Sequence, residues 1–422
     1  MLRSALLQIT LVLVATDGIT FFSIGDWGGA ALGQNFVDNV DAVASQMAKT
    51  SPNPQFIVNT GDNFYYCGIQ NTTDTQIEVD FNKPFAASPL EVPWYSVLGN
   101  HEYGYNVEAQ IELAQSHSRW VMDARYYTKR VELGSSGHYA TLIFLDSSPC
   151  VSAYRASDNS GWDPCGSEYP TCSIDDTDDD WEGVCKFHEN IMGQDCGAQY
   201  TWFQQQLAKV PADDWLFVVG HHPADEMDVA DMTSAMQAHG FDLFLNGHAH
   251  TLTQYEVDGN SAYVTTGAGS MVSTADQNHA HVQTKVLGGN IPANETSNGH
   301  SYSTVWNQKV AGFTTHTFSS DYTQLTTNYI TYAGETVHSF TVTKGGAPPG
   351  PQPSPTPSPP PGPSGGSCCY SKEGSGSCSA GDVCCKSNCK DPSSCSYTET
   401  GCSGEYGKKH NCVWKDNHCV VS

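Results

Sequence analysis

The sequence predicts an α/β domain in which helices cover the sheets, followed by a smaller unit. Apolar, β-rich runs alternate with stretches that have apolar residues at helical spacing, which is typical of an α/β core. A Thr-, Tyr- and Val-rich region from 267 to 342 predicts additional strands. The length of 422 residues exceeds what one core usually accommodates. The expected strands are 21–24, 55–60, 94–98, 139–145, 215–219, 242–245 and 262–266, and the expected helices are 35–49, 107–122 and 199–210.

Both ends of the chain differ in composition from its middle. Residues 1–18 combine Arg3 with an apolar run at 5–15 and are predicted to be a signal peptide. The main domain is then 19–344, and a Pro-, Ser- and Gly-rich linker at 345–367 separates it from a cysteine-rich module at 368–422. Because the leader and the even cysteine counts indicate an oxidising route, we favour disulfides over a zinc site in this module. We expect a secreted protein, at the cell surface or in a lysosome- or vacuole-like compartment.

The charge balance limits the partners of this chain. A formal net charge of −26 argues against nucleic acid and against anionic membrane surfaces, since both would be repelled. With only 19 Lys and Arg residues, an anionic substrate needs another source of positive charge, and metal ions are the obvious candidate. The triplets that begin at Asn71 and Asn294 are compatible with N-glycosylation.

An irregular stretch at 148–197 holds five of the six cysteines of the main domain and an acidic run at 175–182. It is interpreted either as a disulfide-pinned insertion that overhangs the active site, or as a calcium site, or as a solvated surface loop. We favour the surface loop, because no EF-hand spacing is present.

Five of the predicted strands end in the same way, with a glycine followed by Asp, Asn or His. The ligand site of an α/β sheet lies beyond the carboxyl ends of its strands, so these turns can converge on one point. A single such pair is commonly only a turn, but five of them in metal-ligating residue types favour a shared metal site. The polar residues that follow these glycines are Asp26, Asp62, Asn100 with His101, His221 with His222, and His248 with His250.

The order of these turns, with Gly-Asp-Asn-Phe-Tyr at 61–65, resembles the purple acid phosphatases of the small, single-domain type within the metallophosphoesterase superfamily. Most of the superfamily places His two residues after the first Asp, whereas this chain has Gly28 there and Tyr65 three residues after Asp62. The resemblance covers nearly all of residues 20–270. It implies an αββα sandwich with two central mixed sheets.

The resemblance also implies a set of metal ligands. A phenolate favours a trivalent ion, whereas imidazoles and an amide oxygen suit a divalent one. The pair that the resemblance implies is Fe(III) with Fe(II), Zn(II) or Mn(II), and charge transfer from Tyr65 to Fe(III) would give the purple colour of that family. By the resemblance, Asp26, Tyr65 and His250 bind one ion, Asn100, His221 and His248 bind the other, and Asp62 bridges them.

Two histidines are candidates for roles beyond metal binding. His101 is the candidate proton donor to the leaving alcohol, because imidazole titrates near the working pH. After His221, small family members usually carry Tyr before Pro and a further His downstream, whereas this chain has His222 and no histidine at 224–227. His222 is therefore either a substrate contact that replaces the proton donor or a side chain that points to solvent.

The predicted function is hydrolysis of the monoesters of small phosphorylated substrates at acidic pH. One alternative is a dimetal phosphodiesterase or nucleotidase, which would use nearly the same ligands. Another is an inactive surface-binding protein that acts through its tail. Aromatic residues of 368–422 could stack on sugars of a cell wall or polysaccharide, and ordinary packing explains them equally well.

Overall fold

The computed structural model describes residues 18–30, 34–156, 163–165, 185–272, 295–297, 299–345, 412–415 and 418–421. The chain divides into two compact units, Met1–Pro355 and Thr356–Ser422. In the second unit, β16 (Cys412–Lys415) and β17 (His418–Val421) form an antiparallel hairpin. The predicted signal peptide, the acidic run and almost all of the predicted linker and cysteine-rich module lie outside the described residues. No described helix is long and apolar enough to cross a membrane.

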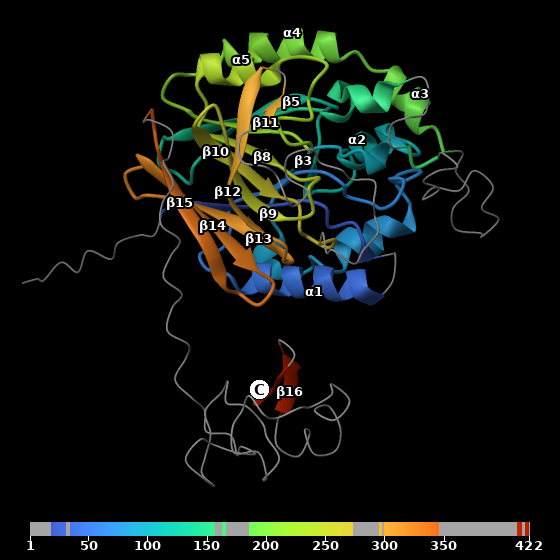
Figure 1. Ribbon diagram of the computed structural model, residues 1–422, viewed down its shortest axis with the longest axis vertical. Coiled ribbons are helices and arrows are strands. Elements are labelled where there is room, and N and C mark those ends of the chain that lie inside the picture. Colours follow the sequence, from blue (N-terminus) through green and yellow to red (C-terminus); the bar gives the residue numbers. More distant parts are fainter. Residues whose placement is uncertain are drawn as a thin grey trace, which may run out of the picture. The chain divides into compact units, whose positions relative to one another are not determined.

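The first unit contains two mixed sheets (Figure 1). In the seven-stranded sheet, β1 to β4 pair in parallel, whereas β1, β13, β14 and β15 pair antiparallel. Its strands, in spatial order, are β15 (Thr336–Thr343), β14 (Gln324–Thr331), β13 (Gly312–Phe318), β1 (Thr20–Ile24), β2 (Ile57–Asn59), β3 (Trp94–Ser96) and β4 (Trp120–Val121).

The eight-stranded sheet is built in a similar way. Its centre, from β6 through β7 and β8 to β10, is parallel, and antiparallel strands flank it on both sides. The spatial order is β11 (Glu295–Ser297), β12 (His300–Gln308), β9 (Leu252–Val257), β10 (Asn260–Thr266), β8 (Leu243–Asn246), β7 (Trp215–Val219), β6 (Tyr139–Phe144) and β5 (Tyr127–Glu132).

Alternation of apolar side chains explains how the layers stack. Along β7, Phe217 belongs to the core between the sheets, whereas its neighbour Val218 packs with α4 (Cys196–Leu207) and α5 (Met232–His239). Successive side chains of a strand point to opposite faces, so a strand buried on both faces is apolar throughout. On the far side, α1 (Gln34–Lys49) lies along the first sheet (Figure 1). Its residues Val40 and Met47 are buried in the core between them. The predicted α/β class and the two central mixed sheets between helices are confirmed.

One predicted helix is much shorter than expected. Instead of 107–122, the helix α2 covers only Glu108–Leu113, and Trp120 continues as strand β4. The ring of Trp120 packs against Trp27 and Phe81, with centroid distances of 6.3 and 5.1 Å. Pairing of β4 with β3 and burial in this aromatic cluster therefore override the helical spacing of the sequence.

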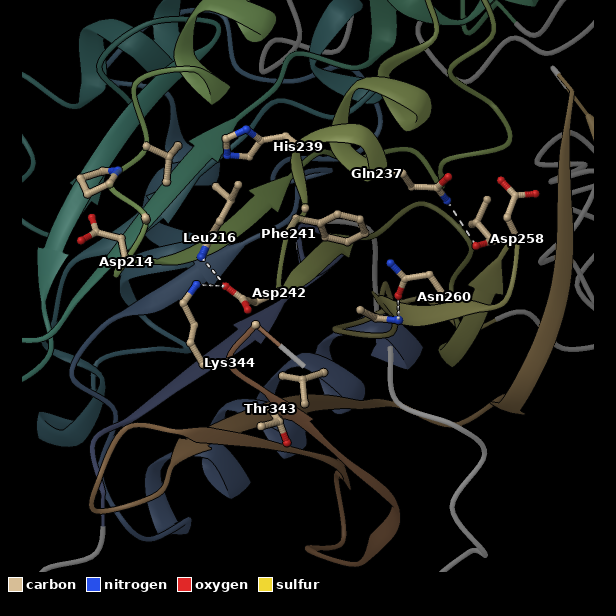
Figure 2. Close-up of a pocket in the computed structure, with 18 of the residues that line it drawn as sticks. Asp214, Leu216, Gln237, His239, Phe241, Asp242, Asp258, Asn260, Thr343 and Lys344 are labelled. Atoms are coloured by element: carbon tan, nitrogen blue, oxygen red, sulfur yellow. Dashed lines mark hydrogen bonds and ion pairs between the residues drawn. The ribbon is translucent and has the colours of Figure 1, made fainter. Parts of the chain in front are cut away.

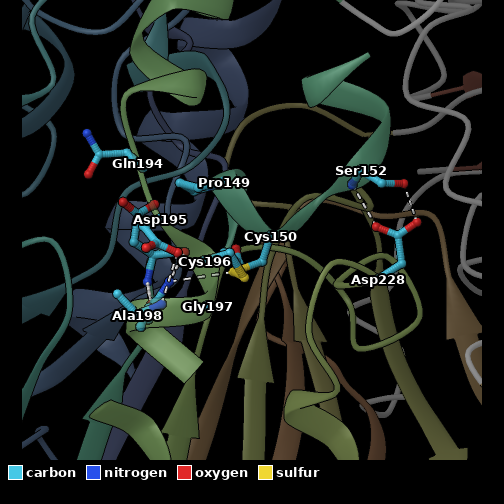
Figure 3. The surroundings of a disulfide bond; sticks show 12 residues. Pro149, Cys150, Ser152, Gln194, Asp195, Cys196, Gly197, Ala198 and Asp228 are labelled. Carbon is cyan, nitrogen blue, oxygen red and sulfur yellow. Dashed lines mark hydrogen bonds between the residues drawn. A yellow bond between two sulfur atoms is a disulfide. The ribbon is translucent and has the colours of Figure 1, made fainter. Parts of the chain in front are cut away.

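Disulfides fix part of the irregular stretch at 148–197. Cys150, at the end of η5 (Ser148–Cys150), is bonded to Cys196 at the start of α4 (Figure 3). Cys165 is bonded to Cys185, and Cys67 is also disulfide-bonded. Beyond the first of these disulfides, η6 (Ser152–Arg155) begins with Ser152, whose N–H donates to Asp228 at 2.6 Å. This bond ties the loop after β7 to the disulfide-bonded segment.

A buried histidine joins β1, which leads to the predicted site, to β13 and β14. The Nε2 atom of His316 lies 3.0 Å from the hydroxyls of both Ser23 and Thr314, and its Nδ1 atom lies 2.9 Å from that of Thr327. The imidazole also stacks on Phe21 at 4.4 Å. Because burial among these neutral groups disfavours the charged ring, the pKa of His316 is lowered to about 3.

We expect His316 to make the fold less stable at acidic pH. An unfolded chain protonates this imidazole below about pH 6.5, whereas the folded chain does not until about pH 3, so stability falls as pH falls through this window. In His316→Gln, the loss of unfolding free energy between pH 6.5 and 4.5 should be smaller by about 2 kcal/mol. Urea unfolding at several pH values measures this slope. Exposed His239→Gln serves as the control, and parallel curves for H316Q and wild type would contradict the prediction.

Candidate metal centre

The five glycine-containing turns lie at the carboxyl ends of β1, β2 and β3 in one sheet and of β7 and β8 in the other. Four of the expected ligands adopt left-handed backbone conformations that direct their side chains inward. Their φ angles are 57° at Asp26, 51° at Asp62, 68° at His248 and 49° at His250. Non-glycine residues rarely adopt this region, and such residues cluster at functional sites. The strand ends therefore hold these four residues in a backbone conformation that they would rarely adopt by themselves.

Two glycines make room for the ligands. A Cβ atom at Gly99 would lie 2.1 Å from Asp62 Oδ1, and one at Gly247 would lie 2.3 Å from Asp26 Oδ2. Any other residue at these two positions would displace a carboxylate. The glycines before Asn100 and His248 are thus required by contacts between turns as well as by the turns themselves.

Three of the predicted ligands meet around a tyrosine hydroxyl. The hydroxyl of Tyr65 lies 3.2 Å from Asp26 Oδ1 and 3.2 Å from His250 Nε2. His250 Nε2 also lies 3.3 Å from Asp26 Oδ1. Tyr65 and Asp26 are fully buried, and His250 is nearly so. These three donors form one half of the centre.

A second group lies beside the first. His221 Nε2 is 3.0 Å from Asn100 Oδ1 and 3.2 Å from His248 Nδ1. Asp62 joins the two groups, because its Oδ2 atom lies 3.3 Å from the Tyr65 hydroxyl and 3.3 Å from His221 Nε2. All seven residues predicted as ligands are therefore brought together, and Asp62 has the place of a bridge.

Electrostatics indicates that this cluster needs cations. Burial, followed by the charges of Asp26 and Asp62, raises the pKa of the Tyr65 phenol well above its usual value. At His221, burial acts against protonation, but Asp62 outweighs it and raises the pKa to about 9. A phenolate at Tyr65 thus requires a strong positive charge within reach. Carboxylate, phenol, imidazole and amide donors around one point match the preferences of a trivalent and a divalent ion, so the residues fit a metal pair.

Glu102, in the short helix η4 (His101–Tyr103), holds the turns after β2 and β3 together. Its Oε2 atom accepts from the N–H groups of Gly99 at 2.6 Å and Asp62 at 3.1 Å. Its Oε1 atom accepts from those of Asn63 at 2.8 Å and Phe64 at 3.0 Å. The sequence alone assigned no role to Glu102. Nothing in the sequence around it indicates that its carboxylate accepts hydrogen bonds from the backbone of another turn.

His101 lies at the edge of the cluster. Its Nδ1 atom is 2.7 Å from the carbonyl oxygen of Tyr66, and its Nε2 atom is 3.9 Å from Asp62 Oδ2. The carbonyl accepts the Nδ1–H, which directs Nε2 toward the centre. Burial lowers the pKa of His101 to about 4 despite the nearby Asp62.

His222 is fully buried, so it does not point to solvent. Its Nδ1 atom is 2.8 Å from the hydroxyl of Ser147, and its Nε2 atom is 3.0 Å from that of Tyr154. Its ring lies 4.4 Å from that of His248. Because both nitrogens have protein partners, a contact with substrate through His222 would require one of these bonds to open.

A cavity of about 720 Å³ lies elsewhere, where β7 and β8 begin (Figure 2). Leu216, Asp242 and Lys344 line it, and the Lys344 ammonium is 2.8 Å from the Asp242 carboxylate. The turns that carry His221 and His248 are at the other ends of the same strands. This cavity is therefore separate from the metal centre.

The chain is similar to several known proteins. A family model described as calcineurin-like phosphoesterase matches residues 19–252. The chain is 30% identical to purple acid phosphatase 17 of Arabidopsis thaliana, over 64% of this chain and 75% of that protein. It is 25% identical to tartrate-resistant acid phosphatase type 5 of Rattus norvegicus, over 67% of this chain and 82% of that protein. The chain also resembles a solved structure described as GAP50, the anchor in the inner membrane complex of Plasmodium. The match covers 78% of this chain and 90% of that chain, with a TM-score of 0.54 and 17% sequence identity. At this identity the match shows a shared fold alone.

We expect Glu102→Gln to loosen the two ligand turns. Each carboxylate oxygen accepts two N–H groups, so whichever oxygen becomes an amide NH₂ leaves two donors without an acceptor. The free energy of unfolding should fall by about 2–4 kcal/mol. Metal content after dialysis against a chelator should fall as well. Urea unfolding and elemental analysis measure the two effects.

Glu112→Gln, at an exposed position of α2, is the matched control and should behave as wild type. An E102Q protein that retains wild-type stability and metal content would exclude this role for Glu102.

Proposed function

We propose that the chain hydrolyses phosphate monoesters at acidic pH with an Fe(III)–M(II) pair. The premise is that the chain belongs to the calcineurin-like phosphoesterase family and is an acid phosphatase of the purple type. The family resemblance predicted from sequence is confirmed, and with it phosphoester hydrolysis at a dinuclear metal site. The proposal concerns the substrate class, the pH and the identities of the metals. M(II) is Fe(II), Zn(II) or Mn(II).

The position of Tyr65 is the observation that supports the proposal most. Its hydroxyl lies within 3.3 Å of Asp26, Asp62 and His250, so a phenol takes part in the ligand cluster itself. Phenolate is a hard anionic donor that suits a trivalent ion. We assign Asp26, Tyr65 and His250 to Fe(III), and Asn100, His221 and His248 to the divalent ion, with Asp62 between them.

The protein side chains have distinct tasks in this reaction. When bound, the two ions neutralise phosphate oxygens and activate a water for in-line attack. The buried ligand turns hold both positions in place and exclude bulk solvent around Asp26 and Asp62. The Tyr66 carbonyl directs His101 Nε2 toward the centre, where the ring in its protonated form donates a proton to the leaving alcohol or stabilises its developing charge.

Small monoesters fit the charge of the site better than nucleic acid does. The chain has a formal net charge of −26, which repels long polyanions, so attraction to phosphate comes from the metal ions. We propose a secretory route for the enzyme, because the first unit contains the disulfides Cys150–Cys196 and Cys165–Cys185.

Iron and substrate class can be tested in one preparation. The purified protein should contain iron and a second metal, absorb visible light, and hydrolyse an aryl phosphate monoester faster than the matching diester. Tyr65→Phe should lose the visible band, and its kcat should fall by about 10-fold or more. Neighbouring Tyr66→Phe is the matched control and should keep both. An iron-free, colourless protein that cleaves only diesters would exclude the acid monoesterase, and one without turnover would favour a binding role.

The role of His101 predicts a dependence on the leaving group. A poor leaving group needs a proton donor, whereas a nitrophenolate departs without one. His101→Gln should therefore lower kcat for an alkyl phosphate by about 100-fold or more, and much less for nitrophenyl phosphate. Exposed His138→Gln should leave the kcat ratio of the two substrates unchanged. An equal loss on both substrates in H101Q would assign His101 a different role.

A further inference from the structure

We propose that Glu226 is a positioning residue that fixes the orientation of His248, so that Nδ1 rather than Nε2 is the nitrogen that binds metal. The proposal rests on the assignment of His248 as a ligand in the proposed function. It concerns a carboxylate from the loop after β7 that the ligand set does not include.

The two nitrogens of His248 face different partners. Its Nδ1 atom lies 3.2 Å from His221 Nε2, in the direction of the ligand cluster. Its Nε2 atom lies 3.2 Å from Glu226 Oε2, away from the cluster. A neutral imidazole has one N–H and one lone pair, and a metal requires the lone pair. With the proton on Nε2 and donated to Glu226, the lone pair of Nδ1 is left for the metal.

His221 is oriented by the same principle but through a different acceptor. Its Nδ1–H donates to the carbonyl oxygen of Thr60 at 2.8 Å, which leaves Nε2 for the metal. Histidine ligands usually donate their other N–H to a carbonyl or a carboxylate, and these partners set the tautomer and the basicity of the ring. Of the two neighbouring histidines, one thus binds through Nε2 with a neutral partner, and the other through Nδ1 with an anionic one.

The loop that carries Glu226 is well anchored. The N–H of Glu226 donates to the carbonyl of Pro223 at 3.1 Å, and that of Val229 donates to the carbonyl of Cys150 at 3.1 Å. Asp228 accepts the N–H of Ser152, next to the Cys150–Cys196 disulfide (Figure 3). The side chain of Glu226 is only 12% exposed. The carboxylate is therefore held at His248 by the fold and is not a surface group that meets it by chance.

His222 supports the ring of His248 from another side. The Ser147 hydroxyl accepts the N–H groups of His221 at 3.1 Å and His222 at 3.0 Å, so it donates its own proton to His222 Nδ1. His222 then carries its proton on Nε2 and donates it to Tyr154. A neutral ring in a fixed tautomer packs 4.4 Å from His248, which limits rotation of that ligand.

The charges of the centre give Glu226 a further effect. The positive charge of the proposed Fe(III)–M(II) pair exceeds the negative charge of its three anionic ligands, Asp26, Asp62 and Tyr65, by two. A carboxylate one imidazole away from the divalent ion offsets part of this excess and favours retention of that ion.

Metal affinity tests the proposal directly. In Glu226→Ala, the dissociation constant for Zn(II) at the more weakly held position should rise by about 10–100-fold, as measured by competition with a chromophoric chelator. In Glu226→Gln the amide oxygen still accepts the Nε2–H, so the affinity should lie between those of E226A and wild type. The visible band associated with Tyr65 should persist in both, because this tyrosine belongs to the other half of the centre. Exposed Glu189→Ala is the control.

A spectroscopic measurement does not depend on how well the variants fold. In wild-type protein loaded with Zn(II), long-range ¹H–¹⁵N spectra should place the proton of His248 on Nε2. A proton on Nδ1, or a Zn(II) affinity of E226A within about threefold of wild type, would overturn the proposal. If the wild-type protein itself binds no metal, the ligand assignment of the proposed function fails. If it binds metal and only E226A is unaffected, the inference about Glu226 alone fails.

Discussion

Four backbone N–H groups donate to one buried carboxylate, that of Glu102, and the geometry of the centre depends on this interaction. Three donors, Asp62, Asn63 and Phe64, belong to the turn after β2, and the fourth, Gly99, belongs to the turn after β3. The bridging position of Asp62 and the approach of Asn100 to His221 both require these turns to stay in register. Because strands β2 and β3 are only three residues long, their ladder alone is a weak constraint. A buried acceptor shared between the turns supplies the missing rigidity.

Burial of negative charge is the second determinant of the site. Asp26, Asp62 and Tyr65 lie together with almost no exposure, and neighbouring carboxylates oppose ionisation of the phenol. Isolated buried anions cost far too much free energy to remain unpaired. In a chain with 19 Lys and Arg against 45 Asp and Glu, metal ions complete the balance that protein cations do not supply.

The proposed ligands have local signals in the sequence, whereas the residues that support them do not. A glycine followed by Asp, Asn or His after an apolar run is a local pattern that marks five of the proposed ligands, and Tyr65 and His250 lie within three residues of two of these five. The structure brings all seven residues together. Glu102 and Glu226 have no comparable local signal, since their partners come from turns far away in the chain. The same limit applied to Trp120, whose strand pairing and aromatic packing overrode helical spacing. Hydrogen-bond acceptors for distant turns and strands at the edge of a sheet are determined by tertiary structure. The spacing of apolar residues in the sequence does not predict them.

The two halves of the centre differ in how they are supported, and this difference follows from the fold. The donors around Tyr65 include carboxylates that follow strands of the first sheet, together with His250 from the second sheet. The other set joins Asn100 of the first sheet to His221 and His248 of the second, and these two imidazoles are oriented by acceptors outside the cluster, Thr60 and Glu226. Anionic donors in direct contact favour the ion of higher charge, and oriented neutral imidazoles favour the one of lower charge. On the ligand assignment proposed above, the two positions would therefore favour ions of different charge. Each set of donors draws on both sheets, and the Asp62 carboxylate lies 3.3 Å from the Tyr65 hydroxyl of one set and 3.3 Å from His221 Nε2 of the other.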